Sequence, residues 1–232
     1  MKPIKIGEVN VYPFRDMSDL ISYSDSHKNL YISLNAEIIY KAKDEIAGII
    51  NNHVGYADGF GAVKVLKSKG AKEVERIPGC ELWLELIKRH HSDRTFYLIG
   101  ATEETIQTTV AKLKEMYSDI NIRGYRNGFI KSEDERNAVI NDVAKKKPDY
   151  VFVAMGFPIQ EKLMYDMYQI HKAVYLNLGG SFDVFTGKVS RAPKLIQKMG
   201  LEWFYRFVTH PSRYKRQIVY LQFSWAYLRN KL

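Results

Sequence analysis

Short apolar runs alternate along this chain with longer amphipathic stretches, and this alternation restricts the fold more than any other feature. Runs rich in β-branched and aromatic side chains, each only a few residues long, predict buried strands. These runs are Leu30–Leu34, Thr95–Ile99, Ile120–Ile122, Tyr150–Ala154 and Ala173–Leu178. Strands that alternate with helices predict a mostly parallel sheet with helices on both faces.

The stretches between these runs have the spacing and the end signals of helices. In Thr102–Tyr117 apolar side chains recur every three or four residues, which predicts one amphipathic helix. Ser132 and Glu135 form a capping box, and the helix that they open ends at Lys145–Lys147 before Pro148. The predicted fold is therefore α/β and Rossmann-like.

Length and composition limit the class of protein. A chain of 232 residues with 46% hydrophobic and 26% charged residues is typical of a globular protein with one large domain, or with one domain and an appendage. The single cysteine, Cys80, cannot form an internal disulfide, which favours a reducing cytosol. Neither a signal peptide nor an apolar window of about 20 residues is present, so we expect membrane contact to be peripheral. The net charge of +9 predicts an acidic partner: nucleic acid, anionic lipid or a phosphorylated substrate.

Small and polar residues follow four of the predicted strands. They are Asn35–Glu37, Gly100–Thr102, Met155–Pro158 and Gly179–Ser181, and Gly156 lies within the third group. Such turns before helices present free backbone N–H groups to phosphates, and in parallel sheets they gather at one edge. Four of them favour a nucleotide or sugar-nucleotide site over ordinary turns. The strict glycine fingerprints of dinucleotide and P-loop sites are absent.

Two aspartates are candidates for chemistry. Asp58 lies in Tyr56–Gly61, which we interpret as a short loop between two helical stretches. Its glycine neighbours predict an accessible backbone and few packing duties for this carboxylate. Asp183 lies in the glycine-flanked stretch Gly179–Gly187, where it would bind a sugar hydroxyl or cap a turn. For both residues the structural alternative, an aspartate that caps a turn or helix, is common.

No metal or cofactor is predicted. The six histidines are scattered, no Asp-x-Asp follows an apolar run, and Glu133–Glu135 are better explained as first-turn charges of a helix. Three further polar residues, Arg76, Gln160 and Glu161, lie next to the loops described above. Each alone is more often a surface residue, but together they extend the candidate site.

The composition changes after residue 195. Residues 196–232 contain seven basic residues, one acid and nine aromatic residues, with a break at Pro211. Helical spacing places rings on one face and cations on the other, which is typical of a helix in a membrane interface. A helix packed on the domain with a solvated basic face is the alternative, and nucleic-acid binding is disfavoured because the basic residues lie among large apolar groups. We therefore expect a catalytic domain at 1–195 and a membrane-docking helical appendage at 196–232.

Several motifs occur in an order and spacing that resemble one known family. They are Leu34–Glu37, Tyr56–Gly59, Glu75–Gly79, Met155–Glu161, Gly179–Gly187, Arg191–Pro193 and Leu201–Arg206. Over nearly the whole chain this pattern is similar to the WecG/TagA/CpsF glycosyltransferases. One departure is Ile159, which stands where many members carry Lys or Arg.

The resemblance implies an inverting, metal-independent transferase at the cytoplasmic face of the bacterial inner membrane. It would move N-acetylmannosamine, N-acetylmannosaminuronate, glucose or galactose from a UDP donor to an undecaprenyl-diphosphate-linked sugar, commonly N-acetylglucosamine. The product would enter O-antigen, common antigen, capsule or teichoic acid. Asp183–Gly187 is more similar to members that make common-antigen-like glycans than to the teichoic-acid type, which tilts the expected donor accordingly. A membrane-anchored nucleotide-binding regulatory protein without transferase activity is the alternative, and the sequence leaves a homo-oligomer open.

The resemblance also assigns roles to residues. Asp58 matches the proposed catalytic base, Asn35 and Gln160 match donor-pocket positions, and three tail arginines match positions that meet the lipid diphosphate or the leaving group. The expected substrate-binding residues are Asn35, Arg76, Gly100, Gly156, Gln160, Glu161, Gly179, Gly180, Asp183, Arg206, Arg213 and Arg216.

Overall fold

The computed structural model describes residues 1–193, 196, 205, 214–229 and 232, except the side chains of 214–217. The strands are β1 Ile4–Ile6, β2 Val9–Val11, β3 Leu30–Leu34, β4 Val54–Ala57, β5 Thr95–Gly100, β6 Asn121–Arg126, β7 Tyr150–Ala154 and β8 Val174–Asn177. The helices are α1 Met17–Ser26, α2 Ala36–Lys41, α3 Asp44–Asn51, α4 Phe60–Ser68, α5 Gly79–His90, α6 Glu103–Met116, α7 Glu133–Lys146, α8 Ile159–Ile170, α9 Ser181–Thr186 and α12 Tyr214–Leu228.

Six strands form one sheet in the order β4-β3-β8-β7-β5-β6, and every neighbouring pair is parallel. The predicted parallel sheet is confirmed, and β3 and β7 have the predicted bounds. The predicted helices are confirmed too, because Thr102 and Ser132 cap α6 and α7 by accepting hydrogen bonds from backbone N–H groups three residues on. These features depend on local sequence, which explains why they were predictable.

Two expectations about strands were wrong. The run at Ile120–Ile122 extends to Arg126 as the edge strand β6, whose alternating polar residues hid its length. Asp58 does not lie between two helices, because β4 precedes it directly. Gly55 disguises β4 in the sequence but fits its position, since a Cβ there would lie 2.6 Å from Leu34 Cδ1.

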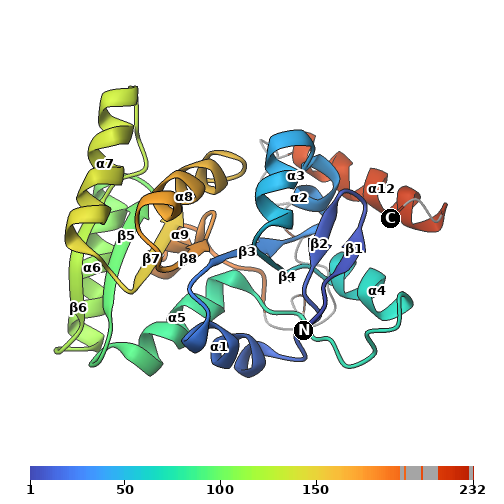
Figure 1. Ribbon diagram of the computed structural model, residues 1–232, viewed down its shortest axis with the longest axis horizontal. Helices are drawn as coiled ribbons and strands as arrows, with labels where there is room; N and C mark the ends of the chain where they lie inside the picture. The colour runs from blue at the N-terminus through green and yellow to red at the C-terminus, as the bar shows by residue number, and fades with distance from the viewer. Residues whose placement is uncertain (194–195, 197–204, 206–213, 230–231) are drawn as a thin grey trace.

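The antiparallel hairpin β1–β2 was also not predicted. It precedes a segment that runs alongside β4, where the Tyr12 N–H donates to the Gly55 carbonyl over 2.7 Å. The hairpin strands are too short for an alternating pattern to stand out in the sequence. It lies next to α4, at the same end of the molecule as α12 (Figure 1).

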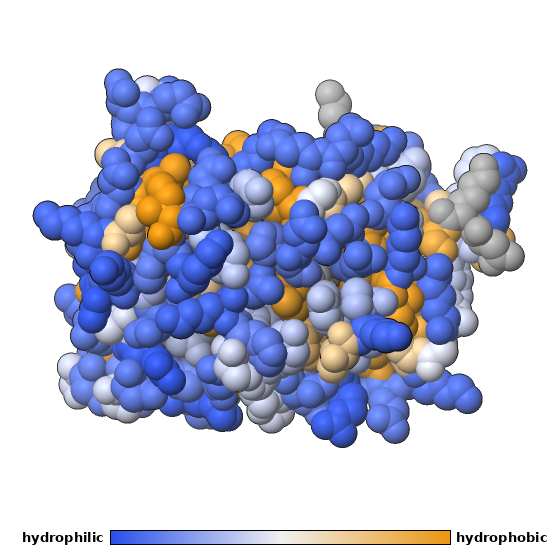
Figure 2. All heavy atoms as spheres, viewed as in Figure 1, coloured by the Kyte–Doolittle hydropathy of each residue, from blue (hydrophilic) through white to orange (hydrophobic). Residues whose placement is uncertain are grey.

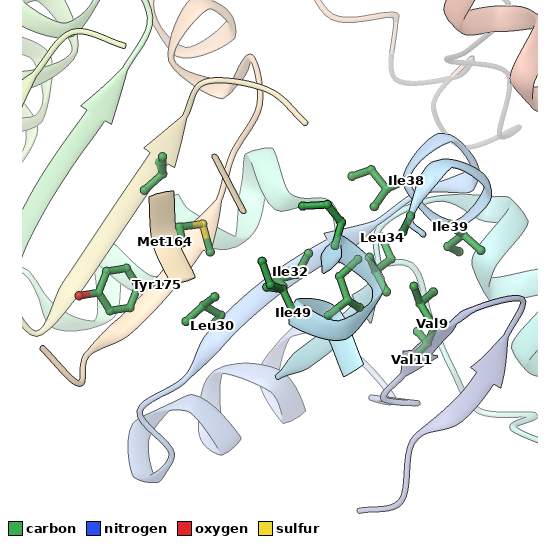
Figure 3. Close-up of a cluster of buried hydrophobic side chains, with 14 of the residues drawn as sticks. Val9, Val11, Leu30, Ile32, Leu34, Ile38, Ile39, Ile49, Met164 and Tyr175 are labelled. Atoms are coloured by element: carbon green, nitrogen blue, oxygen red, sulfur yellow. The ribbon is translucent and has the colours of Figure 1, made fainter. Parts of the chain in front are cut away.

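Two hydrophobic clusters cover the two faces of the sheet. Side chains of α2, α3, α4, α7 and α8 belong to one cluster, and those of α1, α5, α6 and α9 belong to the other. Leu30, Ile32 and Leu34 of β3 face the first cluster, beside Ile49 and Met164 (Figure 3). Each such fully buried aliphatic side chain stabilises the fold by about 1.5–3 kcal/mol.

The C-terminal helix α12 packs on the α/β core. It contacts α2 at one end of the molecule, whereas β6, α6 and α7 lie at the other end (Figure 1). Val219 and Phe223 of α12 are buried against the core. Among the residues that the structure describes, no helix has the length and apolar character needed to cross a bilayer. Hydrophilic side chains dominate the face seen in Figure 2.

Candidate functional site

The predicted loops meet at one edge of the molecule. Since all six strands are parallel, the residues that follow β3, β4, β5, β7 and β8 lie at the carboxyl edge of the sheet. The helix after β3 packs on one face and the helix after β8 on the other, although β3 and β8 are neighbours. Chains that diverge in this way leave the strand ends accessible, which is the usual place for a ligand in an open parallel sheet.

Asp58 and Gly59 lie next to Leu34 and Asn35 at this edge. The Asp58 N–H donates to the Leu34 carbonyl over 3.1 Å. A Cβ on Gly59 would lie 3.2 Å from both Cα and Cβ of Asn35, so glycine permits this close approach. The Asn35 side chain caps α2 by accepting from the Ile38 N–H over 3.0 Å. The structure therefore brings together the predicted base and one predicted donor-pocket residue.

Arg76 completes this side of the site. Its Nε donates to the Asp58 carbonyl over 2.7 Å and lies 4.0 Å from the Asp58 carboxylate. Its guanidinium also lies over the Phe60 ring, 5.2 Å from the ring centroid. The side chains of Arg76 and Asp58 are 18% and 25% exposed, so a bound substrate has access to both charges.

Tyr56 lies beneath Asp58 and was not singled out from the sequence. Its hydroxyl is fully buried, 3.2 Å from where a Cβ on Gly79 would lie. Burial, followed by the negative charge of Asp58, raises the pKa of the Tyr56 hydroxyl well above its ordinary value. Tyr56 thus remains a neutral phenol below Asp58. Only its place in a short run of four buried residues, Val54–Ala57, could have indicated it.

Gln160 holds the loops after β7 and β8 together. Its Oε1 accepts hydrogen bonds from the backbone N–H groups of Met155 (3.3 Å), Gly156 (3.0 Å) and Gly179 (3.1 Å). The prediction that these turns present free N–H groups to phosphates was therefore wrong for these three groups. The amide of Gln160 takes the place that a phosphate oxygen was expected to occupy.

Glu161 and Asn177 extend this connection to β3. Gln160 and Glu161 are 2% and 0% exposed, so neither is the surface residue that sequence statistics favour. Glu161 Oε1 accepts from Gln160 Nε2 (2.9 Å) and from Asn177 Nδ2 (2.8 Å), and Asn177 Oδ1 accepts from the Ser33 N–H (2.6 Å). Asn177, at the end of β8, is a further residue that sequence reasoning missed.

The glycines of the site have two different roles. Gly100 has φ +141°, and a Cβ there would lie 2.3 Å from the Ala154 carbonyl oxygen, so packing between β5 and β7 requires glycine. Around the Cβ positions of Gly156, Gly179 and Gly180, by contrast, no atom of the described residues beyond the adjoining ones lies within 4 Å. These three glycines border open space and allow a ligand to approach the backbone closely.

Asp183 lies in the first turn of α9, the helix that follows the β8 loop. Its Oδ1 accepts a 3.3 Å hydrogen bond from Thr105 Oγ1, which joins α9 to α6. The Asp183 carbonyl accepts from the Val189 N–H over 3.0 Å. The side chain is half-buried and joins two helices, which differs from the expected cap of a turn because Gly180 is the N-cap of α9.

The tail arginines are only partly described. Arg206 and Arg213 lie outside the described residues, and Arg216 belongs to α12 but its side chain is not among those described. The helix itself reaches the site, because a Cβ on Gly61 would lie 2.9 Å from the Phe223 ring and 3.6 Å from Ala36 Cβ. α12 therefore contacts the first turns of α4 and α2, the helices that follow Asp58 and Asn35.

Within the described part of the chain, no group of three or more His, Cys, Asp or Glu residues is placed to hold a metal ion. The fold and the site define an α/β protein with charged groups and open glycine loops at the carboxyl edge of a parallel sheet, the usual arrangement of α/β enzymes that bind nucleotide-like ligands. A model of the glycosyl transferase WecG/TagA/CpsF family matches residues 5–232. The chain belongs to this family, which makes it a glycosyltransferase of bacterial polysaccharide synthesis.

Proposed function

We propose that this protein transfers a sugar, with inversion and without a metal, from a UDP donor to an undecaprenyl-diphosphate-linked sugar. The reaction would take place at the cytoplasmic face of a bacterial inner membrane. The observation that carries the proposal is the position of Asp58, which lies beside Arg76 and Asn35 and follows the strand at the outer edge of the sheet. The α12 helix contacts Gly61 in the first turn of α4, which follows Asp58, so membrane contact and chemistry would share one surface.

Asp58 would act as the general base. An aspartate is ordinarily ionised at neutral pH and can accept the proton of an acceptor hydroxyl. The acceptor oxygen forms a bond to the anomeric carbon as the bond from that carbon to the UDP oxygen breaks, and the leaving diphosphate keeps the electron pair. Attack from the face opposite UDP inverts the anomeric centre.

The departing diphosphate needs positive charge because no metal takes part in this proposal. Arg76 is 18% exposed beside Asp58 and would supply part of that charge. Arg206, Arg213 and Arg216 would supply the rest when the tail meets the lipid diphosphate. Gly156, Gly179 and Gly180 would let the donor lie close to the backbone.

The outer face of α12 supports docking to an anionic membrane. Ile218, Leu221, Trp225 and Leu228 recur every three or four residues and are 40%, 65%, 56% and 77% exposed. They lie on a different face from Val219 and Phe223, which pack on the core. An exposed apolar stripe on a basic segment suits the interface of a bilayer, where rings and aliphatic groups enter the headgroup region. We accordingly propose residues 196–232 as the docking appendage.

The test is a panel of UDP-sugars with a lipid-diphosphate-linked N-acetylglucosamine, read by the mass of the lipid product. UDP-N-acetylmannosamine, its uronic acid, UDP-glucose and UDP-galactose form the panel. Asp58→Asn should lower turnover by about 10²- to 10⁴-fold, the usual contribution of a general base. Binding of UDP should survive because the carboxylate acts on the acceptor.

Asp134→Asn is the matched control, because Asp134 is an exposed first-turn residue of α7. It should keep wild-type turnover. Undiminished turnover in Asp58→Asn would refute the assignment of the base. UDP binding without product from any donor would instead favour a nucleotide-binding regulatory protein.

A further inference from the structure

Glu161 is buried, acidic and at the centre of a network that joins three strand ends. Its Oε1 accepts from the side-chain amides of Gln160 and Asn177, whose own oxygens accept from backbone N–H groups of the β7, β8 and β3 segments. One carboxyl oxygen therefore connects both glycine loops to the strand that precedes Asn35.

The backbone determines how both amides are oriented. A backbone N–H can only donate, so the oxygens of Gln160 and Asn177 must face Gly156, Gly179 and Ser33. The NH₂ groups of both amides must then point toward Glu161. Position 161 is required to present one acceptor to two donors, and a buried donor left without an acceptor costs about 1–3 kcal/mol.

The second carboxyl oxygen of Glu161 has a different environment. Glu161 Oε2 is buried and has no hydrogen-bond partner among the described residues. Burial raises the pKa of the Glu161 carboxyl above its ordinary value, which favours the neutral acid. A neutral carboxylic acid has nearly the shape of a carboxamide, so glutamine is its closest substitute.

We infer that Glu161 is a positioning residue, which holds the Gln160 amide in place and thereby shapes the two glycine loops that receive the donor. Its effect comes from the reach and the acceptor geometry of the side chain, and it does not exchange a proton with substrate. The consequence for donor binding rests on the proposed function, whereas the consequence for the loops does not.

Two substitutions separate these roles. Glu161→Gln keeps the length and the acceptor oxygen but removes the acidity, whereas Glu161→Asp keeps the acidity but withdraws the acceptor by one methylene. If Glu161 is a positioning residue, Glu161→Gln should keep the loop structure and donor binding that Glu161→Asp loses. If Glu161 exchanges a proton in the reaction, Glu161→Asp should keep turnover and Glu161→Gln should lose it.

The order of the two loops is measured by hydrogen exchange of the backbone amides, in peptides that cover Met155, Gly156 and Gly179. Glu161→Asp should speed exchange of these amides by about tenfold, since the loss of one hydrogen bond is worth roughly that factor. Glu161→Gln should match the wild type. Val143→Ala, a buried truncation in α7 that belongs to neither loop, controls for a general loss of stability and should leave these amides protected.

The kinetic arm uses the donor that the wild type turns over fastest. Glu161→Asp should raise the donor KM by about tenfold and leave kcat within about threefold, while Glu161→Gln stays within about threefold of the wild type in both. Unchanged exchange and unchanged donor KM in Glu161→Asp would overturn the inference. A Glu161→Gln variant that folds but has no turnover would also overturn the inference. If Glu161→Asp does not fold, the turnover of Glu161→Gln alone decides whether Glu161 is a positioning residue.

Failure of the proposed function would look different. If the wild type turns over no UDP-sugar, the proposed reaction is wrong, but the exchange experiment still decides whether Glu161 positions the loops.

Discussion

The loop after β4 and the two loops after β7 and β8 lie at the same edge of the sheet but are built in opposite ways. The β4 side carries its charges near the surface, with Asp58 and Arg76 about one-quarter and one-fifth exposed. The β7–β8 side buries its polar groups: Gln160 accepts hydrogen bonds from backbone N–H groups of both loops, and Glu161 accepts from the Gln160 amide. The difference indicates a division of work: one side offers reactive groups to substrate, and the other maintains the shape of the space that substrate enters.

The largest expected effect on the β7–β8 side comes from its neighbour Gly100, the last residue of β5, in the substitution Gly100→Ala. The new Cβ would lie 2.3 Å from the Ala154 carbonyl oxygen at the end of β7, in a backbone conformation with φ +141°. We expect a loss of about 3 kcal/mol or more in the free energy of unfolding, measured by chemical denaturation.

Gly180→Ala is the contrasting variant. Gly180 has φ −97°, and in the part of the chain that the structure describes, only adjoining residues come within 4 Å of its Cβ position. Its stability should change by less than about 0.5 kcal/mol, while the donor KM rises because the methyl group enters the space proposed for the donor. Equal destabilisation by both alanines would contradict the distinction between packed and open glycines.

Arg76→Lys tests the charged side. Lysine keeps the charge but lacks the Nε that donates to the Asp58 carbonyl. Hydrogen bonds from charged groups contribute about 1.5–3 kcal/mol, so we expect turnover to fall by about 10- to 100-fold with little change in stability. Initial rates and thermal denaturation measure the two effects. Arg15→Lys, at an exposed position in an exposed ion pair, should behave as the wild type.

Trp225→Glu tests whether the charged side is also the membrane side. Trp225 is 56% exposed on α12, with the Arg229 guanidinium 4.0 Å from the centre of its ring. Replacing the ring by a carboxylate should weaken binding to anionic vesicles by about tenfold or more, with the thermal midpoint unchanged. Phe129→Glu, at a position 60% exposed in the loop after β6, is the control. A similar loss of vesicle binding in Trp225→Glu and Phe129→Glu would argue against α12 as the docking surface.

The smallest expected effect is at Ala101, where the backbone itself is strained. Ala101 follows Gly100 and has φ +56°, a conformation that glycine adopts without steric cost. Ala101→Gly should raise the free energy of unfolding by about 0.5–1 kcal/mol. Ala111→Gly, at an exposed interior position of α6, should lower it by about 1 kcal/mol. If both substitutions lower the free energy of unfolding, the backbone at Ala101 is not strained.

Local patterns in the sequence determined much of this architecture. Buried runs such as Leu30–Leu34 and Tyr150–Ala154 predicted strands at their observed bounds, and Thr102 and Ser132 marked the starts of two helices. Strand and helix periods are set by residues a few positions apart, so one sequence contains them. The gathering of loops at one edge followed as well, because parallel strands place their carboxyl ends together.

Only the tertiary structure decided what those loops do. It placed Asp58 directly after a strand, with Gly59 against Asn35. It also turned Gln160 and Glu161 inward, where Gln160 accepts from N–H groups that had been assigned to phosphate and Glu161 accepts from the Gln160 amide. It also seated Phe223 of α12 on Gly61, beside the candidate base. Burial of a polar side chain and contact between distant segments depend on how helices pack across the whole sheet. No pattern within a short stretch of sequence records that packing.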